Sequence, residues 1–240
     1  MKIAFIPTIH TLESDDTDYH MALTHLVLKY PEYEEYYSNV EGYVILDNSL
    51  IELGGSVDVE TVMEAADKIC PHEIVLPDVF LDCDKTLEAT EDALRQVDFP
   101  SLHLQAVAHG KDINDWKRCW DKLNKLEELD CIAIPKVVTT IFGHRKDAIT
   151  YALDNNPSNK EIHLLGLWDT ILELKSYTPE QKKKIRGIDT SFVMHSVVDG
   201  MSYERGEFDK PNYKIDLEHE YLYNNKLLED NKKFVLDILK

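Results

Sequence analysis

Polar side chains recur directly after the short apolar runs of this sequence. The run YVIL leads into Asp47, Asn48 and Ser49, and two later runs lead into further acids. The residues that end these runs are Asp47, Asp78, His109 with Gly110, Lys136, Gly166 with Trp168, and Asp189. One Asp before a helix is commonly an N-cap, but recurrence on successive runs is harder to explain by capping. The pattern predicts carboxylates, an imidazole and an ammonium group around one site.

Three acids around one pocket suggest chemistry at an acetal-like carbon. One carboxylate can attack or stabilise an oxocarbenium-like centre while another manages the proton of the leaving group. The sequence contains no G-x-x-x-x-G-K or G-x-G-x-x-G phosphate motif and no H-x-x-x-H pair. Cys70, Cys83, Cys119 and Cys131 form no C-x-x-C pair and no Cys/His cluster with zinc spacing. We therefore expect glycosyl chemistry with no metal and no other cofactor.

Seven apolar, β-branched runs are the expected strands that position these residues. They start at residues 2, 42, 73, 102, 131, 161 and 185 and, after the first gap, recur about every 30 residues, with helix-like segments such as SVDVETVMEAADKI between them. This alternation is typical of parallel strands with crossover helices. The leading fold is an α/β, TIM-type (β/α)8 barrel, and an open doubly wound sheet is the alternative. For the eighth strand, VMHSVVDGM and NYKIDL are both candidates, so the barrel can be irregular at its last strand.

Length and composition indicate one domain. The 240 residues, 43% of them hydrophobic, suffice for one sizeable core, and we expect a single barrel domain over 1–240. The segment 219–240 has helical periodicity and is expected to pack on the outside as a C-terminal helix. No stretch approaches the ~20 apolar residues that span a bilayer, so we expect no membrane association and a cytoplasmic protein with reduced thiols.

The net charge of −19 lowers the expectation of a nucleic-acid partner without excluding it. Basic residues do gather locally. The candidate phosphate contacts are Lys182, Lys183, Lys184, Arg186, Arg205 and Lys210. A partner protein or a homo-oligomer is a second source of positive surface.

The order of short motifs resembles that of the tRNA-guanine transglycosylase superfamily, in particular its short phage-type members, which place 7-deazaguanine bases in DNA. The matching pieces are LDNS (46–49), VLPD (75–78), AVAHG (106–110), IAIPK (132–136), HLLGL (163–167) and GIDTS (187–191). Each piece is short, so the specificity lies in the series. The fold of that family is a TIM barrel, which agrees with the strand period.

The resemblance implies roles for the three acids. Asp189 in GIDTS matches the nucleophile that attacks C1′ of the target nucleotide and holds it covalently. Asp47 in LDNS matches the general acid/base that serves the departing guanine and the incoming base. Asp78 in VLPD matches the acid that accepts hydrogen bonds from the Watson–Crick edge of the base.

The resemblance also suggests neighbours for these acids. In the larger enzymes, a Gln and a Gly in one loop contact the carbonyl group of the base. His109 and Gly110 match this loop, so His109 stands in place of the Gln. The remaining expected substrate contacts are Asn48, Ser49, Ile134, Pro135, Lys136, Gly166 and Trp168. Lys136 has no clear family counterpart, but its ammonium group suits a phosphate or a carbonyl oxygen.

Two departures favour DNA over tRNA as the substrate. The tRNA enzymes carry a C-x-C-x-x-C…H zinc site that is absent here, and their chains are much longer. We therefore expect exchange of guanine in DNA for a free 7-deazaguanine base, with the 7-cyano form as the leading candidate. For a phage-encoded protein, the location would be the host cytoplasm.

Other functions stay open. A tRNA guanine transglycosylase is the nearest alternative, and a nucleosidase would differ only in admitting water after guanine leaves. A Schiff-base lyase or aldolase would use Lys136 as its amine nucleophile. A non-catalytic, acidic binding protein on a retained barrel is the remaining class.

Overall fold

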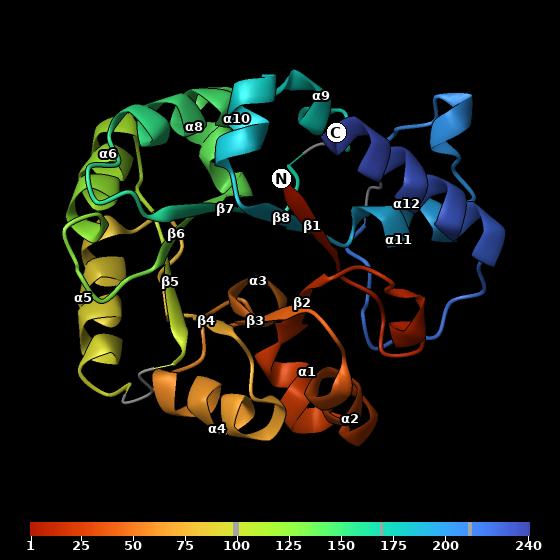
Figure 1. Cartoon of the computed structure of the whole chain (residues 1–240), viewed down its shortest axis with the longest axis horizontal. Coiled ribbons are helices and arrows are strands. Elements are labelled where there is room, and N and C mark those ends of the chain that lie inside the picture. The colour runs from red at the N-terminus through yellow and green to blue at the C-terminus, as the bar shows by residue number, and fades with distance from the viewer. Residues whose placement is uncertain (98–100, 169, 211–212) are drawn as a thin grey trace.

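The computed structural model describes residues 1–97, 101–168, 170–210 and 213–240. Eight parallel strands form one sheet in the order β1-β8-β7-β6-β5-β4-β3-β2, which curls into a nearly closed, irregular (β/α)8 barrel (Figure 1). The strands are β1 (Lys2–Phe5), β2 (Tyr19–Leu23), β3 (Tyr43–Asp47), β4 (Glu73–Val75), β5 (His103–Val107), β6 (Cys131–Pro135), β7 (Glu161–Leu165) and β8 (Gly187–Thr190). The predicted barrel is thus confirmed.

Helices surround the strands (Figure 1). They are α1 (Thr24–Lys29), α2 (Pro31–Asn39), α3 (Leu50–Leu53), α4 (Val59–Ile69), α5 (Cys83–Leu94), α6 (Ile113–Leu123), α7 (Thr139–Phe142), α8 (Arg145–Asp154), α9 (Glu173–Ser176), α10 (Pro179–Lys184), α11 (Phe192–Val198) and α12 (Asn225–Leu239). Short 3-10 helices are η1 (Leu12–Ser14), η2 (Lys136–Val138) and η3 (Tyr203–Arg205).

Helix α4 illustrates how the sequence forms the outer layer. The Asp58 side chain caps its first turn by accepting a hydrogen bond from the Thr61 N–H at 2.9 Å. Val62, Ala66 and Ile69 then recur on one face, and all three are buried. The helix therefore covers the barrel wall with one apolar stripe and exposes its charged residues.

The strands are buried on both faces because helices cover the outside and side chains fill the inside. On β3, Leu46 joins the outer core, whereas Ile45 joins the inner cluster. The inner cluster consists of Ala4, Tyr19, Met21, Ile45, Val75, Val107 and Ala133. Side chains alternate along a strand, so Asp189, which pairs in register with Ala4, also belongs to the inner face of the wall.

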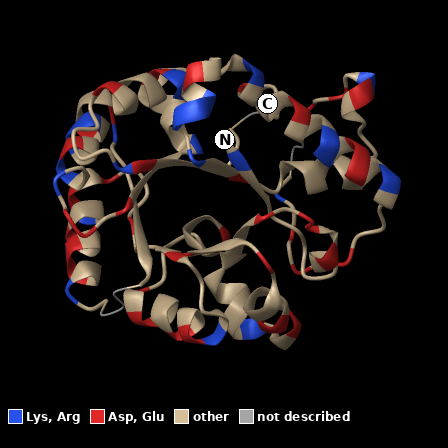
Figure 2. Cartoon of the chain, viewed as in Figure 1, with Lys and Arg blue, Asp and Glu red and all other residues tan. Residues whose placement is uncertain are grey.

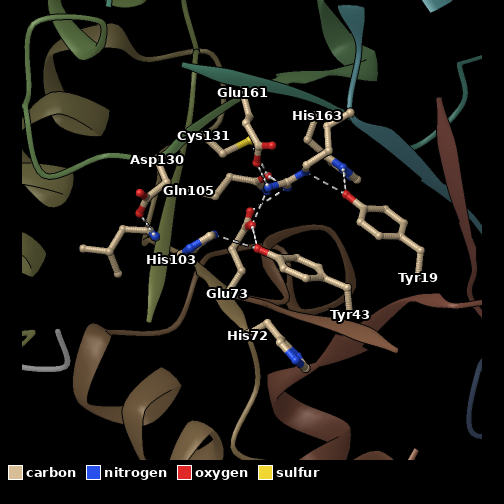
Figure 3. A network of polar contacts seen from close by, with 12 residues as sticks. Tyr19, Tyr43, His72, Glu73, His103, Gln105, Asp130, Cys131, Glu161 and His163 are labelled. Carbon is tan, nitrogen blue, oxygen red and sulfur yellow. Dashed lines mark hydrogen bonds and ion pairs between the residues drawn. The ribbon is translucent and has the colours of Figure 1, made fainter. Parts of the chain in front are cut away.

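The N-terminal end of the barrel interior is polar rather than apolar (Figure 3). Arg186, just before β8, donates two hydrogen bonds to the fully buried Glu73 carboxylate, at 2.5 and 2.7 Å. Tyr43 donates its hydroxyl proton to Glu73 at 2.6 Å, and Gln105 accepts from Arg186 at 3.1 Å. A charged network thus fills the end opposite the carboxyl ends of the strands.

The prediction for the eighth strand was wrong. The missing strand is β2, in the first gap, whereas VMHSVVDGM forms α11 and the turn that follows it. The described part of NYKIDL, residues 213–217, contains no strand. Because β1 pairs only with β8 and β2 only with β3 in the described chain, the irregularity lies between β1 and β2.

The C-terminal helix α12 begins at Asn225, later than the start of the helical pattern at residue 219. Asn224 caps it by accepting from the Leu227 N–H at 3.1 Å. The helix packs against α11 and η3 outside the strands (Figure 1). Residues 219–224 precede it as coil.

Candidate active site

A cavity of about 810 Å³ opens at the carboxyl ends of the strands. This volume lies in the range of small-molecule sites, and this end of a TIM barrel is where active sites are built. Its polar lining includes Asp47, Asn48, Glu52, Asp78, His109, Lys136, Asp189, Thr190, Ser191, His195, Lys210 and Lys214. A second hollow of about 970 Å³ lies between η1, α2 and α12 and shares no lining residue with this cavity.

Asp189 lies near the end of β8 with its side chain almost fully buried. Its Oδ1 accepts hydrogen bonds from the Gly166 N–H at 3.0 Å and from His163 Nε2 at 3.1 Å. Among the described residues, no hydrogen bond engages Oδ2. This oxygen is therefore the one available to a ligand in the cavity.

Gly166 holds the backbone turn that presents its N–H to Asp189. Its φ of +67° is a left-handed conformation that side chains disfavour, and a Cβ there would lie 2.9 Å from Lys136 Cδ. The buried Arg145 on α8 donates to the Gly166 carbonyl at 2.7 Å and is itself bound to Glu173. The turn after β7 is thus held at the Gly166 N–H by Asp189 and at the Gly166 carbonyl by Arg145.

Asp47 ends β3 and lines the same cavity. Burial, followed by the nearby Glu52 charge, raises the pKa of Asp47 well above its ordinary value, although the Ser49 N–H donates to Oδ2 at 2.8 Å. Asp189 and Asp78 raise this pKa further. A carboxyl group of this kind can carry a proton at neutral pH and deliver it to a leaving group.

Glu52 is a cavity residue that the sequence analysis missed. It lies on the one-turn helix α3, directly after the strand-end motif, and burial raises its pKa too. The sequence-based prediction included the residues at each strand end but not those on the helical turn that follows. An acidic residue on that turn, as at Glu52, is the sequence signal that would have found this position.

Asp78, after β4, is held by two neighbours. Asn48 donates to Oδ1 at 2.7 Å, and His109 Nε2 lies 2.6 Å from Oδ2. The Leu81 N–H donates to His109 Nδ1 at 3.3 Å, so the imidazole proton is on Nε2 and is donated to Asp78. His109 therefore orients the carboxylate instead of presenting a free donor to the cavity.

Three lysines reach the cavity. Lys136 follows β6, and burial lowers its pKa while Asp189 and Glu52 oppose that effect. Lys210 Nζ donates to the Trp168 carbonyl at 2.7 Å and lies 4.8 Å from the centre of its ring. Lys214, which the sequence analysis missed, donates to the Ile51 carbonyl at 2.8 Å. The cavity thus combines carboxylates with ammonium groups.

Several other predicted site residues also line the cavity. They are Asn48, Pro135, Gly166 and Trp168. Ser49, Gly110 and Ile134 are not part of the lining, and each is buried in the protein. His195, on α11, lines the cavity without having been predicted.

The predicted basic cluster lies elsewhere. Helix α10 ends at Lys184 and leads into the start of β8, which places Lys182, Lys183 and Lys184 toward the end of the barrel opposite the cavity. Lys182 donates to the Ile238 carbonyl at 2.6 Å. The Arg186 guanidinium is bound to Glu73, so its location does not favour a contact with DNA. Arg205 is exposed on η3 and pairs with Glu207.

Comparison with known proteins gives no assignment: no family model and no curated protein matches this chain significantly. Within the described ranges, no helix is long and apolar enough to cross a membrane. The same residues hold no group of three His, Cys, Asp or Glu side chains suited to a metal ion. The cavity and its lining residues are therefore the features that indicate a function.

Proposed function

We propose that this protein is a base-exchange transglycosylase that replaces guanine in DNA with a free 7-deazaguanine base. The observation that carries the proposal is that Asp47 and Asp189 line one cavity but have different surroundings. Two hydrogen-bond donors stabilise the Asp189 carboxylate, whereas burial and neighbouring acids favour the protonated form of Asp47. Such a division suits one nucleophile and one general acid.

The first half of the reaction breaks the glycosidic bond of the target nucleotide. The base must first leave the stack to reach the cavity. Asp189 Oδ2 attacks C1′ while the C1′–N9 bond breaks, its electron pair passes to N9, and Asp47 supplies a proton to the departing guanine. The product is an ester between Asp189 and the sugar.

The second half reverses these steps with the new base. Asp47, now a carboxylate, takes the proton from the incoming 7-deazaguanine, whose ring nitrogen attacks C1′. The C1′–O bond breaks and returns the electron pair to Asp189. Two inversions retain the configuration, and one glycosidic bond replaces another, so no energy source is required.

Asp78 is the proposed base reader. Guanine-like rings present N–H donors on their Watson–Crick edge, and a carboxylate accepts them. Asn48 and His109 each occupy one lone pair of Asp78, which fixes its direction and leaves further lone pairs for the base. Lys136, Lys210 and Lys214 are the proposed contacts to phosphate or to a carbonyl oxygen.

The test offers guanine-containing duplex DNA, or separately tRNA, together with 7-cyano-7-deazaguanine. Nucleosides are then digested and identified by mass spectrometry. We expect a modified deoxynucleoside from the wild type and none from Asp189→Ala. Exchange by Asp189→Ala would refute the proposed nucleophile, and a modified ribonucleoside would move the substrate to tRNA.

One observation favours a second candidate, a Schiff-base lyase. Lys136 lies at a strand end in the cavity, and burial lowers its pKa, which increases the neutral amine that attacks carbonyls. Borohydride treatment in the presence of small aldehydes and ketones would attach the carbonyl compound to Lys136 in that case. No attachment is expected if the carboxylate pair carries the function.

A further inference from the structure

The hydroxyl of Tyr19 lies between a guanidinium group and an imidazole inside the barrel. Arg186 Nε lies 3.1 Å from the Tyr19 oxygen, and His163 Nδ1 lies 2.9 Å from it. Figure 3 shows Tyr19 and His163 joined in this way. A guanidinium group only donates hydrogen bonds, so the Tyr19 oxygen accepts from Arg186 and its own proton is donated to His163.

This donation fixes the protonation of His163. Since Nδ1 accepts from Tyr19, the imidazole proton is on Nε2, which donates to Asp189 Oδ1 at 3.1 Å. His163 is fully buried, and burial lowers its pKa, with the Arg186 charge acting in the same direction. Each bond therefore agrees with a neutral imidazole.

The chain of hydrogen bonds is anchored at the far end of the barrel. Both Glu73 oxygens accept from Arg186, and Glu161 and Gln105 also accept from it. The Tyr19 ring fits because residue 187 is glycine: a Cβ there would lie 2.5 Å from the ring. We call Glu73, Arg186, Tyr19, His163 and Asp189 the hydrogen-bond chain.

We propose that Tyr19 and His163 are positioning residues that hold one oxygen of the nucleophile Asp189 and leave the other directed to substrate. The role of Asp189 in this statement rests on the proposed function. A doubly protonated His163 would leave the Tyr19 hydroxyl proton without its acceptor and would add a second positive charge near Arg186. It would also pair Asp189 with a cation, which makes a carboxylate a weaker nucleophile.

The groups that act on His163 come from several strands. Asp189 and Glu73 favour its protonation, Arg186 opposes it, and Tyr19 donates to its Nδ1. Cys131 on β6 is also buried beside this network, with a pKa raised well above its usual value, and is neutral. The protonation of His163 therefore depends on Arg186 and Glu73 at the N-terminal end of the barrel as well as on Asp189.

The first measurement is ¹⁵N NMR of labelled histidine as a function of pH. We expect His163 in the wild type to be neutral with its proton on Nε2 from about pH 6 to pH 8, the range in which free histidine titrates. Tyr19→Phe keeps the ring and removes the donor to Nδ1, so His163 should take up its second proton at higher pH. Tyr43→Phe is the matched control, because it removes a hydroxyl bound to Glu73 from the ring stacked on Tyr19.

The second measurement is the rate at which Asp189 forms the covalent ester with guanine-containing DNA when no incoming base is present. Tyr19→Phe should slow it about tenfold at mildly acidic pH, as expected for the loss of one hydrogen bond near a charged group, and the rate should recover as His163 loses its proton. Tyr43→Phe should form the ester at the wild-type rate.

The outcomes separate this inference from the proposed function. A wild-type His163 that is cationic, or protonated on Nδ1, at neutral pH would overturn the inference, and this spectrum decides even if Tyr19→Phe does not fold. Equal titration of His163 in Tyr19→Phe and wild type would also overturn it. If the NMR spectra of His163 are as expected but the wild type forms no ester with DNA, the proposed function is refuted. The hydrogen bonds assigned to Tyr19 and His163 are then still supported.

Discussion

Asp47, Glu52, Asp78 and Asp189 share one cavity but differ in what surrounds each carboxyl group. Asp78 is bound by Asn48 and His109, and Asp189 by two donors on one oxygen. Burial raises the pKa of both Asp47 and Glu52. The local partners, not the residue type, thus divide the acids into hydrogen-bond acceptors and proton carriers.

Glu52→Gln tests the coupling between two of these acids. The Glu52 charge raises the pKa of Asp47, so its removal should lower that pKa. In the proposed reaction, ester formation needs protonated Asp47, so the fall in rate at alkaline pH should begin at lower pH in the variant. Single-turnover rates across the pH range measure this shift.

The control for this experiment is Glu60→Gln, because Glu60 is exposed on α4, away from the cavity lining. It should retain the wild-type pH profile. A shift of the alkaline limb to higher pH in Glu52→Gln would contradict the assignment of Asp47 as the acid.

The position of a residue relative to a strand end was enough to predict that it lines the cavity. Asp47 and Asp189 lie at the ends of strands, Asp78 and His109 lie just after strands, and parallel strands bring their carboxyl ends to one rim. His163 was missed because it lies inside an apolar run and its partner Tyr19 is 144 residues away. Such a contact depends on how the strands are arranged around the barrel, which local pattern does not reveal.

At the level of strands, the ion pair between β4 and the residue before β8 should contribute strongly to stability. Glu73→Ala leaves the Arg186 charge without its main partner, and breaking a buried pair from one side costs about 3–5 kcal/mol. Urea unfolding followed by circular dichroism measures the loss in the free energy of unfolding.

Glu161→Ala is the matched control for this pair. Glu161 binds the same guanidinium at 2.8 Å, but its side chain is 51% exposed. An exposed ion pair contributes less than about 1 kcal/mol. Equal losses for the two variants would show that burial does not set the strength of this network.

Seven strands were predictable because their β-branched, apolar runs are bounded by polar segments. The strand β2 was missed for a physical reason. Its sequence, YHMAL, includes His20, which is buried and bound to Asp15 at 2.9 Å. The preceding connection contains only the short η1, so the strand–helix period fails there.

Across the whole molecule, the charge pattern sets how nucleic acid can be held. Acidic residues are spread over the outer helices (Figure 2). The net charge of −19 disfavours a broad phosphate-binding surface. The lysines at the cavity, Lys136, Lys210 and Lys214, therefore provide the local attraction in our proposal.

Salt dependence tests this distribution of contacts. Neutralising about three phosphates predicts a slope of about −3 in a plot of log binding constant against log salt concentration. Lys214→Ala should reduce the magnitude of that slope by about one, as measured by fluorescence anisotropy with a labelled oligonucleotide. Lys183→Ala, on α10 toward the other end of the barrel, should leave it unchanged.

If Lys183→Ala reduced the magnitude of the slope and Lys214→Ala did not, the DNA would lie on the face that carries the basic cluster Lys182, Lys183 and Lys184. This result would also separate the DNA contacts from the cavity.

The missing ladder between β1 and β2 makes the barrel wall a rolled sheet with a longitudinal seam in the described chain. Tyr19 lies on the β2 side of that seam, and its hydroxyl reaches across the interior to His163 on β7 and Arg186 before β8. The side chains that orient Asp189 therefore also act as a cross-brace for the wall. In this protein, the bracing of the scaffold and the alignment of the Asp189 carboxylate depend on the same phenol.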